Sequence, residues 1–64
     1  MNNSLVNFRI TLGLTQQEMA KYLGTTLSYY SKVELGLRNP SYNFLVKFKS
    51  KFANSDIDKI FFEN

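Results

Sequence analysis

The chain has 64 residues, of which 44% are hydrophobic, so it is long enough for one small domain and too apolar for a disordered segment. It contains no cysteine and no histidine, which excludes disulfides and the commonest metal ligands and favours a cytoplasmic protein without a cofactor. Its net charge is +3, with seven basic against two acidic side chains in residues 1–52 and one against three in residues 53–64. A basic body of this kind suggests a polyanion as partner.

The chain is divided by Gly13, Gly24, Gly36 and the pair Asn39-Pro40, and the apolar spacing between these breaks is helical. We therefore predict an all-α fold of five short helices. No apolar run is long enough to cross a membrane, and the first residues lack the basic and apolar regions of a signal peptide.

The first segment, residues 3–12, places Leu5, Arg9 and Leu12 on one helical face, with an arginine inside an otherwise apolar stripe. Gly13 can adopt the left-handed conformation that commonly ends a helix. The second segment opens with Thr15, and Glu18 follows three residues later, which is the spacing of a capping box. Its inward positions are Met19, Ala20 and Leu23.

The third segment begins at Thr26, the expected N-cap, and ends at Gly36. Tyr30 and Val33 are its inward positions. Because only a tight turn with a glycine separates the second and third segments, residues 15–36 are predicted to form a helix-turn-helix unit.

The fourth segment follows Pro40, with Ser41 as N-cap. Its predicted buried stripe consists of Leu45, Phe48 and Phe52, with Phe44 beside it. The fifth segment covers residues 56–62, with Ser55 as its cap and Asp56 and Asp58 at the positive end of the helix dipole. Its predicted inward residues are Ile57, Ile60 and Phe61.

Four stretches carry a resemblance to a known family: Leu14–Ala20, Leu23–Thr26, Ser31–Gly36 and the pair Asn39-Pro40. Their order and spacing resemble the Cro and phage-repressor class of helix-turn-helix DNA-binding proteins, over residues 5 to about 61. The resemblance implies a compact five-helix bundle of the lambda-repressor type, with residues 1–64 as a single DNA-binding domain.

The resemblance implies that the third segment enters the major groove of DNA and that four positions contact bases: Thr26, Leu27, Ser28 and Lys32. Lys32 can donate to the O6 and N7 acceptors of guanine, and Ser28 can donate or accept. Leu27 and the methyl group of Thr26 can meet thymine methyl groups. Leu27 is unusually apolar for such a position, so the target sequence stays open.

The residues implied to contact phosphates are Gln16, Gln17, Tyr29, Arg38 and Asn39. Gln16 matches the family glutamine that contacts a phosphate and braces the recognition helix, while Arg38 and Asn39 lie in the loop that contacts the backbone. Tyr29 has two interpretations, a phosphate contact or a surface tyrosine that shields apolar neighbours.

The same resemblance explains Arg9, because the family pairs an arginine in its first helix with the glutamate that ends the third, here Glu34. This ion pair would be structural. The sequence departs from the family pattern at Tyr30, where an aliphatic residue is common, and at Leu35, where a polar or basic residue is usual. The hydroxyl of Tyr30 then needs a partner or water.

The function expected is a sequence-specific regulator of transcription that binds double-stranded DNA, a repressor that occupies a palindromic operator as a homodimer. The alternative is a protein-interaction module on the same scaffold, such as an antitoxin or the partner of a regulator. Catalysis is not expected, because Glu18 and Glu34 are assigned to a cap and an ion pair, and we expect no small-molecule ligand. Apolar residues left for a dimer contact are Val6, Phe8, Leu37 and Phe62.

Overall fold

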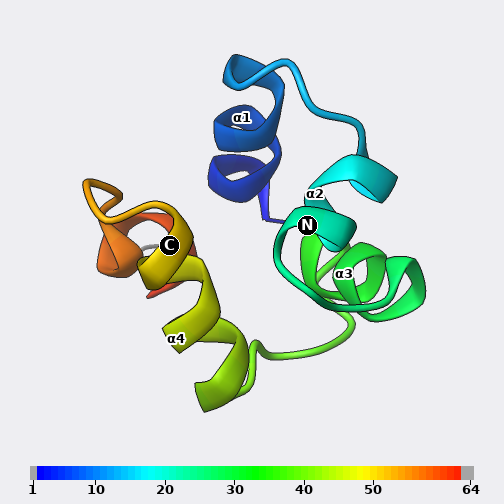
Figure 1. Ribbon diagram of the computed structural model, residues 1–64. Helices are drawn as coiled ribbons and strands as arrows, with labels where there is room; N and C mark the ends of the chain where they lie inside the picture. Colours follow the sequence, from blue (N-terminus) through cyan, green and yellow to red (C-terminus); the bar gives the residue numbers. More distant parts are fainter. Residues whose placement is uncertain (1, 63–64) are drawn as a thin grey trace.

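The computed structural model describes residues 2–62, and within them the chain forms five helices and no strand. They are α1 (Asn3–Thr11), α2 (Gln16–Tyr22), α3 (Leu27–Glu34), α4 (Tyr42–Lys51) and η1 (Asp58–Phe62), the last a short π-helix (Figure 1). The prediction of an all-α fold with five short helices is thus confirmed. Glu63, counted above among the acidic residues of the C-terminal segment, lies outside the described residues.

Two glycines separate α2 from the neighbouring helices, Gly13 after α1 and Gly24 after α2. Gly13 has φ = 73° and Gly24 has φ = 70°, both in the left-handed region that residues with a Cβ rarely adopt. The chain therefore turns sharply at each end, and α2 is only seven residues long.

The N-caps expected for three helices are confirmed. The side chains of Thr15, Thr26 and Ser41 each accept a hydrogen bond from the backbone N–H three residues later. At α2 the side chain of Glu18 also accepts from the backbone N–H of Thr15 at 2.9 Å, which completes the capping box. These caps fix where each helix begins and hence which of its faces points inward.

The core lies between α1, α2, α3 and α4 and is rich in aromatic rings. Its buried hydrophobic residues are Leu5, Met19, Ala20, Leu23, Tyr30, Val33, Phe44, Phe48 and Ile60. The ring of Phe48 lies 5.4 Å from that of Phe8 and 5.1 Å from that of Phe61, so α4 is held against α1 and η1. Phe8 is therefore half-buried against the core, which corrects its place among the apolar residues left over from the packing.

The inward positions predicted at Leu12 and Leu45 are also wrong. Leu12 is 44% exposed because α1 ends at Thr11, so the side chain lies beyond the packed face. In α4 the fully buried pair is Phe44 and Phe48, four residues apart, whereas Leu45 is only half-buried. Phe52, directly after the helix, is half-buried against the core as expected. Leu45 lies about 100° around the helix from Phe44, which turns it partly away from the core.

The C-terminal helix begins two residues later than predicted, at Asp58, and Ser55 does not cap it. The hydroxyl of Ser55 instead donates to the carbonyl oxygen of Phe52 at 2.6 Å. The cap is the side chain of Asp56, which accepts from the backbone N–H of Lys59 at 3.2 Å. Ile60 is buried as expected, while Ile57 and Phe61 are half-buried against the core.

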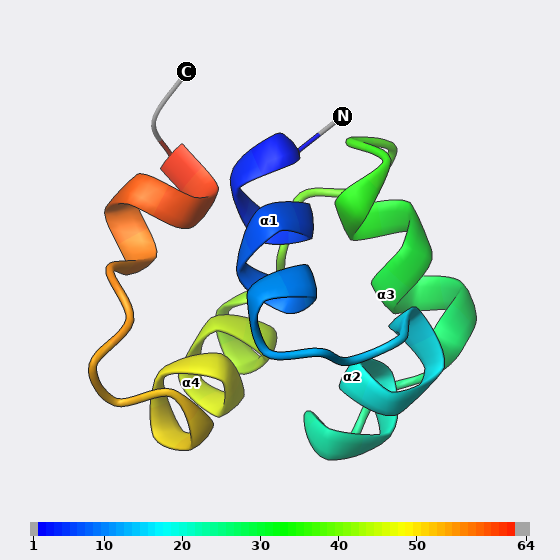
Figure 2. The same cartoon turned by 90° about the horizontal axis from the view of Figure 1, so that it is seen from above.

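The helices pack into a body of 25 × 24 × 23 Å. Seen from above, α1 lies between η1 on one side and the α2–α3 pair on the other (Figure 2). The arrangement joins α2 and α3 closely and leaves the outer face of α3 uncovered. None of the helices in residues 2–62 has the length and apolar character needed to cross a bilayer.

Candidate nucleic-acid interface

The four residues expected to contact bases are all exposed in and just before α3. Thr26 is the N-cap of the helix, and its side chain accepts from the backbone N–H of Tyr29 at 3.1 Å. Leu27, 43% exposed, and Ser28 form the first turn. Lys32 lies one turn further on, on the same side as Ser28. The opposite side of α3 is buried through Tyr30, Val33 and Glu34, so the helix is anchored along one face and open along the other.

A buried ion pair anchors α3 to α1. The carboxylate of Glu34 accepts from Arg9 Nε at 2.7 Å and from Arg9 Nη2 at 3.4 Å. The Glu34 side chain is 2% exposed and that of Arg9 14%, and Arg9 Nη1 also donates to the carbonyl oxygen of Leu14 at 2.9 Å. Arg9 therefore joins the end of α3 to the segment that leads into α2, as the bidentate geometry of a guanidinium permits.

The carboxylate of Glu34 remains charged in this environment. Burial on its own raises the pKa of Glu34, but hydrogen bonds from Arg9 and Gln16 outweigh that effect and hold the pKa below its usual value of 4.5. The negative charge at the end of α3 is thus matched by the guanidinium beside it.

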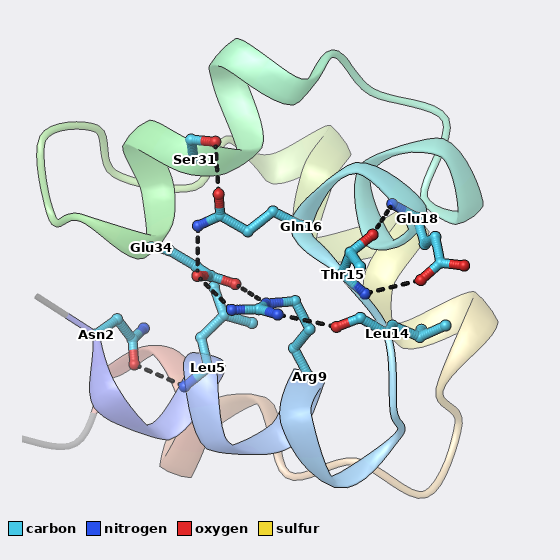
Figure 3. A network of polar contacts seen from close by, with 9 residues as sticks. All are labelled: Asn2, Leu5, Arg9, Leu14, Thr15, Gln16, Glu18, Ser31 and Glu34. Carbon is cyan, nitrogen blue, oxygen red and sulfur yellow. Dashed lines mark hydrogen bonds and ion pairs between the residues drawn. The ribbon is translucent and has the colours of Figure 1, made fainter.

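Gln16 extends this network to α2. Its Nε2 donates to Glu34 Oε1 at 2.9 Å, and its Oε1 accepts from the hydroxyl of Ser31 at 3.3 Å (Figure 3). Gln16 is half-buried, whereas Gln17 beside it is exposed. The first turn of α2 is therefore tied through Gln16 to α3, which is the bracing role expected for this glutamine.

Tyr29 packs as well as facing solvent. It is half-buried, and its ring lies 5.6 Å from that of Phe44 at an angle of 61°. Its hydroxyl oxygen accepts from the backbone N–H of Ser41 at 2.9 Å, which links α3 to the N-cap of α4. The geometry matches the shielding interpretation, and the hydroxyl keeps its own proton for a further acceptor. Arg38 and Asn39 are exposed in the loop between α3 and α4.

Tyr30 introduces a polar atom into the core. Its hydroxyl is buried beside Glu34 but has no hydrogen-bond partner among the residues that the structure describes. Burial raises the pKa of Tyr30 above its usual value of 10.0, so the phenol is neutral at physiological pH.

Two residues of the network were not identified from the sequence. Ser31 donates a hydrogen bond to Gln16. The feature of the sequence that could have identified it is its position three residues before Glu34, on the same side of α3. Asn2 caps α1 and also connects it to two other elements. Its backbone N–H donates to the carbonyl oxygen of Glu34 at 2.8 Å and its Nδ2 to that of Ile60 at 2.9 Å. An asparagine directly before a helical segment was the available signal for the cap.

A polar hollow of about 380 Å³ lies beside the loop after α3, bordered by the first turn of α1 and by η1. Among residues 2–62, Arg38 is the one titratable side chain that lines it. Within residues 2–62 no cluster of three or more carboxylates could hold a metal ion. The exposed groups around α3 are suited to hydrogen bonding and charge pairing with a ligand surface.

The comparisons with known proteins agree with this geometry. A family model described as helix-turn-helix matches residues 5–52, a range that contains α2, α3 and α4 and all of α1 except its first two residues. No curated protein and no solved structure matches the chain.

Proposed function

This chain belongs to the helix-turn-helix family of the Cro and phage-repressor type, and we propose that it regulates transcription by sequence-specific binding to double-stranded DNA. One observation carries the proposal. α3 is fixed along its buried side by Glu34 and leaves Leu27, Ser28 and Lys32 exposed on its outer side, which is the arrangement that a recognition helix needs. The family is a DNA-binding regulatory domain and not an enzyme family, and we assign no catalytic role.

Base recognition is assigned to the first two turns of α3. Lys32 donates to guanine O6 and N7, and Ser28 bonds a neighbouring base edge. Leu27 and the methyl group of Thr26 contact thymine methyl groups. This set of one cation, one hydroxyl and two apolar surfaces is compatible with guanine and thymine in the half-site, and the order of the bases is left to the selection experiment.

Phosphate contacts are assigned to the residues around α3: Gln16, Gln17, Tyr29, Arg38 and Asn39. These contacts set the register of the helix on the duplex and are the same for every sequence. Arg38 supplies a full positive charge, and the four neutral residues supply hydrogen bonds. The compensation of Glu34 by Arg9 supports this assignment, because a bare carboxylate would repel the DNA backbone.

We assign the protein a homodimeric, repressing role on a palindromic operator. One helix of this length reads few base pairs, and two copies would place their recognition helices in half-sites ~34 Å apart. Leu37 is 72% exposed and Phe62 59% exposed, on two segments that border the polar hollow. They are the best candidates for the dimer contact, while Val6 is half-buried. Repression then follows from occupancy alone, in the bacterial cytoplasm that holds the DNA.

The experiment is selection of bound duplexes from a random pool, followed by titration of the selected duplex at several salt concentrations. We expect a palindromic motif to be enriched and the logarithm of the binding constant to fall linearly with the logarithm of salt concentration, because bound cations release counterions from DNA. The control is a duplex of the same length with a scrambled motif, which should bind more weakly at every salt concentration.

The opposite result is no enriched motif together with binding that is insensitive to salt. That result would contradict a DNA-binding role and would favour the protein-interaction module instead.

A further inference from the structure

The side-chain amide of Gln16 is held at both ends by one helix. Its Nε2 donates to Glu34 Oε1 at 2.9 Å, and its Oε1 accepts from Ser31 Oγ at 3.3 Å (Figure 3). Ser31 and Glu34 are three residues apart on α3, so their side chains lie on the same side of the helix. The amide of Gln16 therefore spans two neighbouring polar groups of α3.

The chemistry of the two partners determines the orientation of the amide. Glu34 is ionised and can only accept hydrogen bonds, so Gln16 must present its NH₂ group to it. The oxygen of the amide then faces Ser31, whose hydroxyl can donate. Without that hydroxyl only one end of the amide is fixed, and the last torsion of a glutamine side chain is broad and weakly restrained.

The NH₂ group of Gln16 carries two protons, and the hydrogen bond to Glu34 uses one of them. Because the amide is planar, fixing its plane also fixes the direction of the second N–H bond. In the proposed function this second N–H donates to a DNA phosphate. We propose that Ser31 is a positioning residue, which sets the amide plane of Gln16 and thereby aims its free N–H at the phosphate, without itself contacting DNA.

The inference rests on the proposed function, and it further requires that Ser31 affects DNA affinity only through Gln16. Ser31 is half-buried, and its hydrogen bond to Gln16 is long, so its removal leaves the Arg9–Glu34 pair in place. Ser31→Ala should keep the fold and change DNA affinity only through Gln16. If Ser31 were only structural, Ser31→Ala would lower the melting temperature, and its effect on DNA affinity would not depend on the residue at position 16.

The test is a double-mutant cycle of Ser31→Ala and Gln16→Ala, measured as the dissociation constant of the selected duplex well below the melting temperature. We expect Ser31→Ala to weaken binding roughly three- to tenfold, as the loss of one hydrogen bond does, and by the same factor on a scrambled duplex. In the Gln16→Ala background it should have no further effect. Ser31→Thr, which keeps the hydroxyl, should bind nearly as the unmodified chain does, and the exposed Ser50→Ala serves as a matched control.

A second readout needs no DNA. In the ¹⁵N-correlated NMR spectrum of the free protein, the two side-chain amide protons of Gln16 should shift toward each other and broaden in Ser31→Ala, but not in Ser50→Ala. The positioning role would be overturned if Ser31→Ala lowered DNA affinity equally with glutamine or alanine at position 16, or if the amide signal of Gln16 did not change. The proposed function would stand in that case, provided that Gln16→Ala still weakened DNA binding. Absence of DNA binding by the unmodified chain would instead overturn the proposed function and this inference with it.

Discussion

Glu34 is the residue on which the candidate interface depends most. It is 2% exposed, yet its carboxylate receives hydrogen bonds from Arg9 on α1 and from Gln16 on α2. A charge at this depth is tolerated because its partners replace the lost hydration. One side chain thus couples the orientation of α3 to the two helices that precede it.

We expect Glu34→Ala to lower the free energy of unfolding by about 3–5 kcal/mol, because it leaves Arg9 largely buried without its partner. Chemical denaturation followed by circular dichroism measures the change. Glu18→Ala is the matched control, since Glu18 is an exposed glutamate whose loss affects only the capping box. A loss no larger than that of the control would show that the pair contributes little.

The contribution of Glu34 also has a defined pH dependence. The pKa of Glu34 in the folded chain lies below 4.5, and hydrogen bonds to Thr15 likewise lower the pKa of Glu18. A carboxylate whose pKa is lowered by folding contributes its full stabilisation when the pH is above its pKa in the unfolded chain. This stabilisation is lost as the pH falls through its pKa in the folded chain. Stability should therefore fall below pH 4.5, and less steeply in Glu34→Gln. Parallel profiles for the two chains would contradict the assignment.

The sequence predicted local structure correctly where the hydrogen-bond partners are close along the chain. The caps at Thr15, Thr26 and Ser41 lie where the sequence indicates, because each bonds a backbone N–H only three residues away. The bond from Ser31 to Gln16 joins residues 15 apart, and that from Ser41 to Tyr29 joins residues 12 apart. Such partners become visible only after the helices are packed.

At the scale of elements, Gly13 shows how a glycine separates two helices, here α1 and α2. Gly13 lies at φ = 73° with nothing within 4 Å of the position that a Cβ would take. A side chain there meets no steric obstacle, so the penalty of a substitution comes from the backbone alone.

We expect Gly13→Ala to destabilise the fold by about 1–2 kcal/mol, the penalty of a left-handed conformation for an ordinary residue. Gly13→Asn should lose less, because asparagine adopts this conformation more readily. Thermal melts of the two variants and the unmodified chain measure the difference. Equal losses for alanine and asparagine would mean that something other than backbone strain is responsible.

The elements that sequence reasoning placed less well are α4 and η1. Helical spacing alone allowed either Phe44 or Leu45 to lead the buried stripe, and tertiary contact decided for Phe44, whose ring meets those of Tyr30 and Phe61. Ser55 and Asp56 are both good cap residues. The structure uses Asp56 because Ser55 turns back to Phe52.

At the scale of the whole molecule, the nine buried hydrophobic residues found among residues 2–62 form a core that supports the exposed face of α3. Helical spacing, glycines and caps predicted the all-α fold and the helix-turn-helix unit, and the resemblance to the family added the expected roles of the exposed residues. The sequence does not indicate which surface would form the contact in the proposed dimer, since exposed apolar residues such as Leu37 and Tyr42 obey no spacing rule. If the selection experiment enriches a palindromic site, two copies must bind side by side, and such a contact surface is then required.

The central claim is that α3 reads bases while the residues around it hold phosphates. The most direct test is to repeat the selection of random duplexes with Lys32→Ala and with Arg38→Ala. Arg38→Ala should enrich the same motif as the unmodified chain and bind every duplex more weakly, with a smaller dependence on salt. Lys32→Ala should lose the preference for guanine at one position of each half-site. If Lys32→Ala enriched an unchanged motif and lost the same affinity on every duplex, α3 would not be reading bases through Lys32.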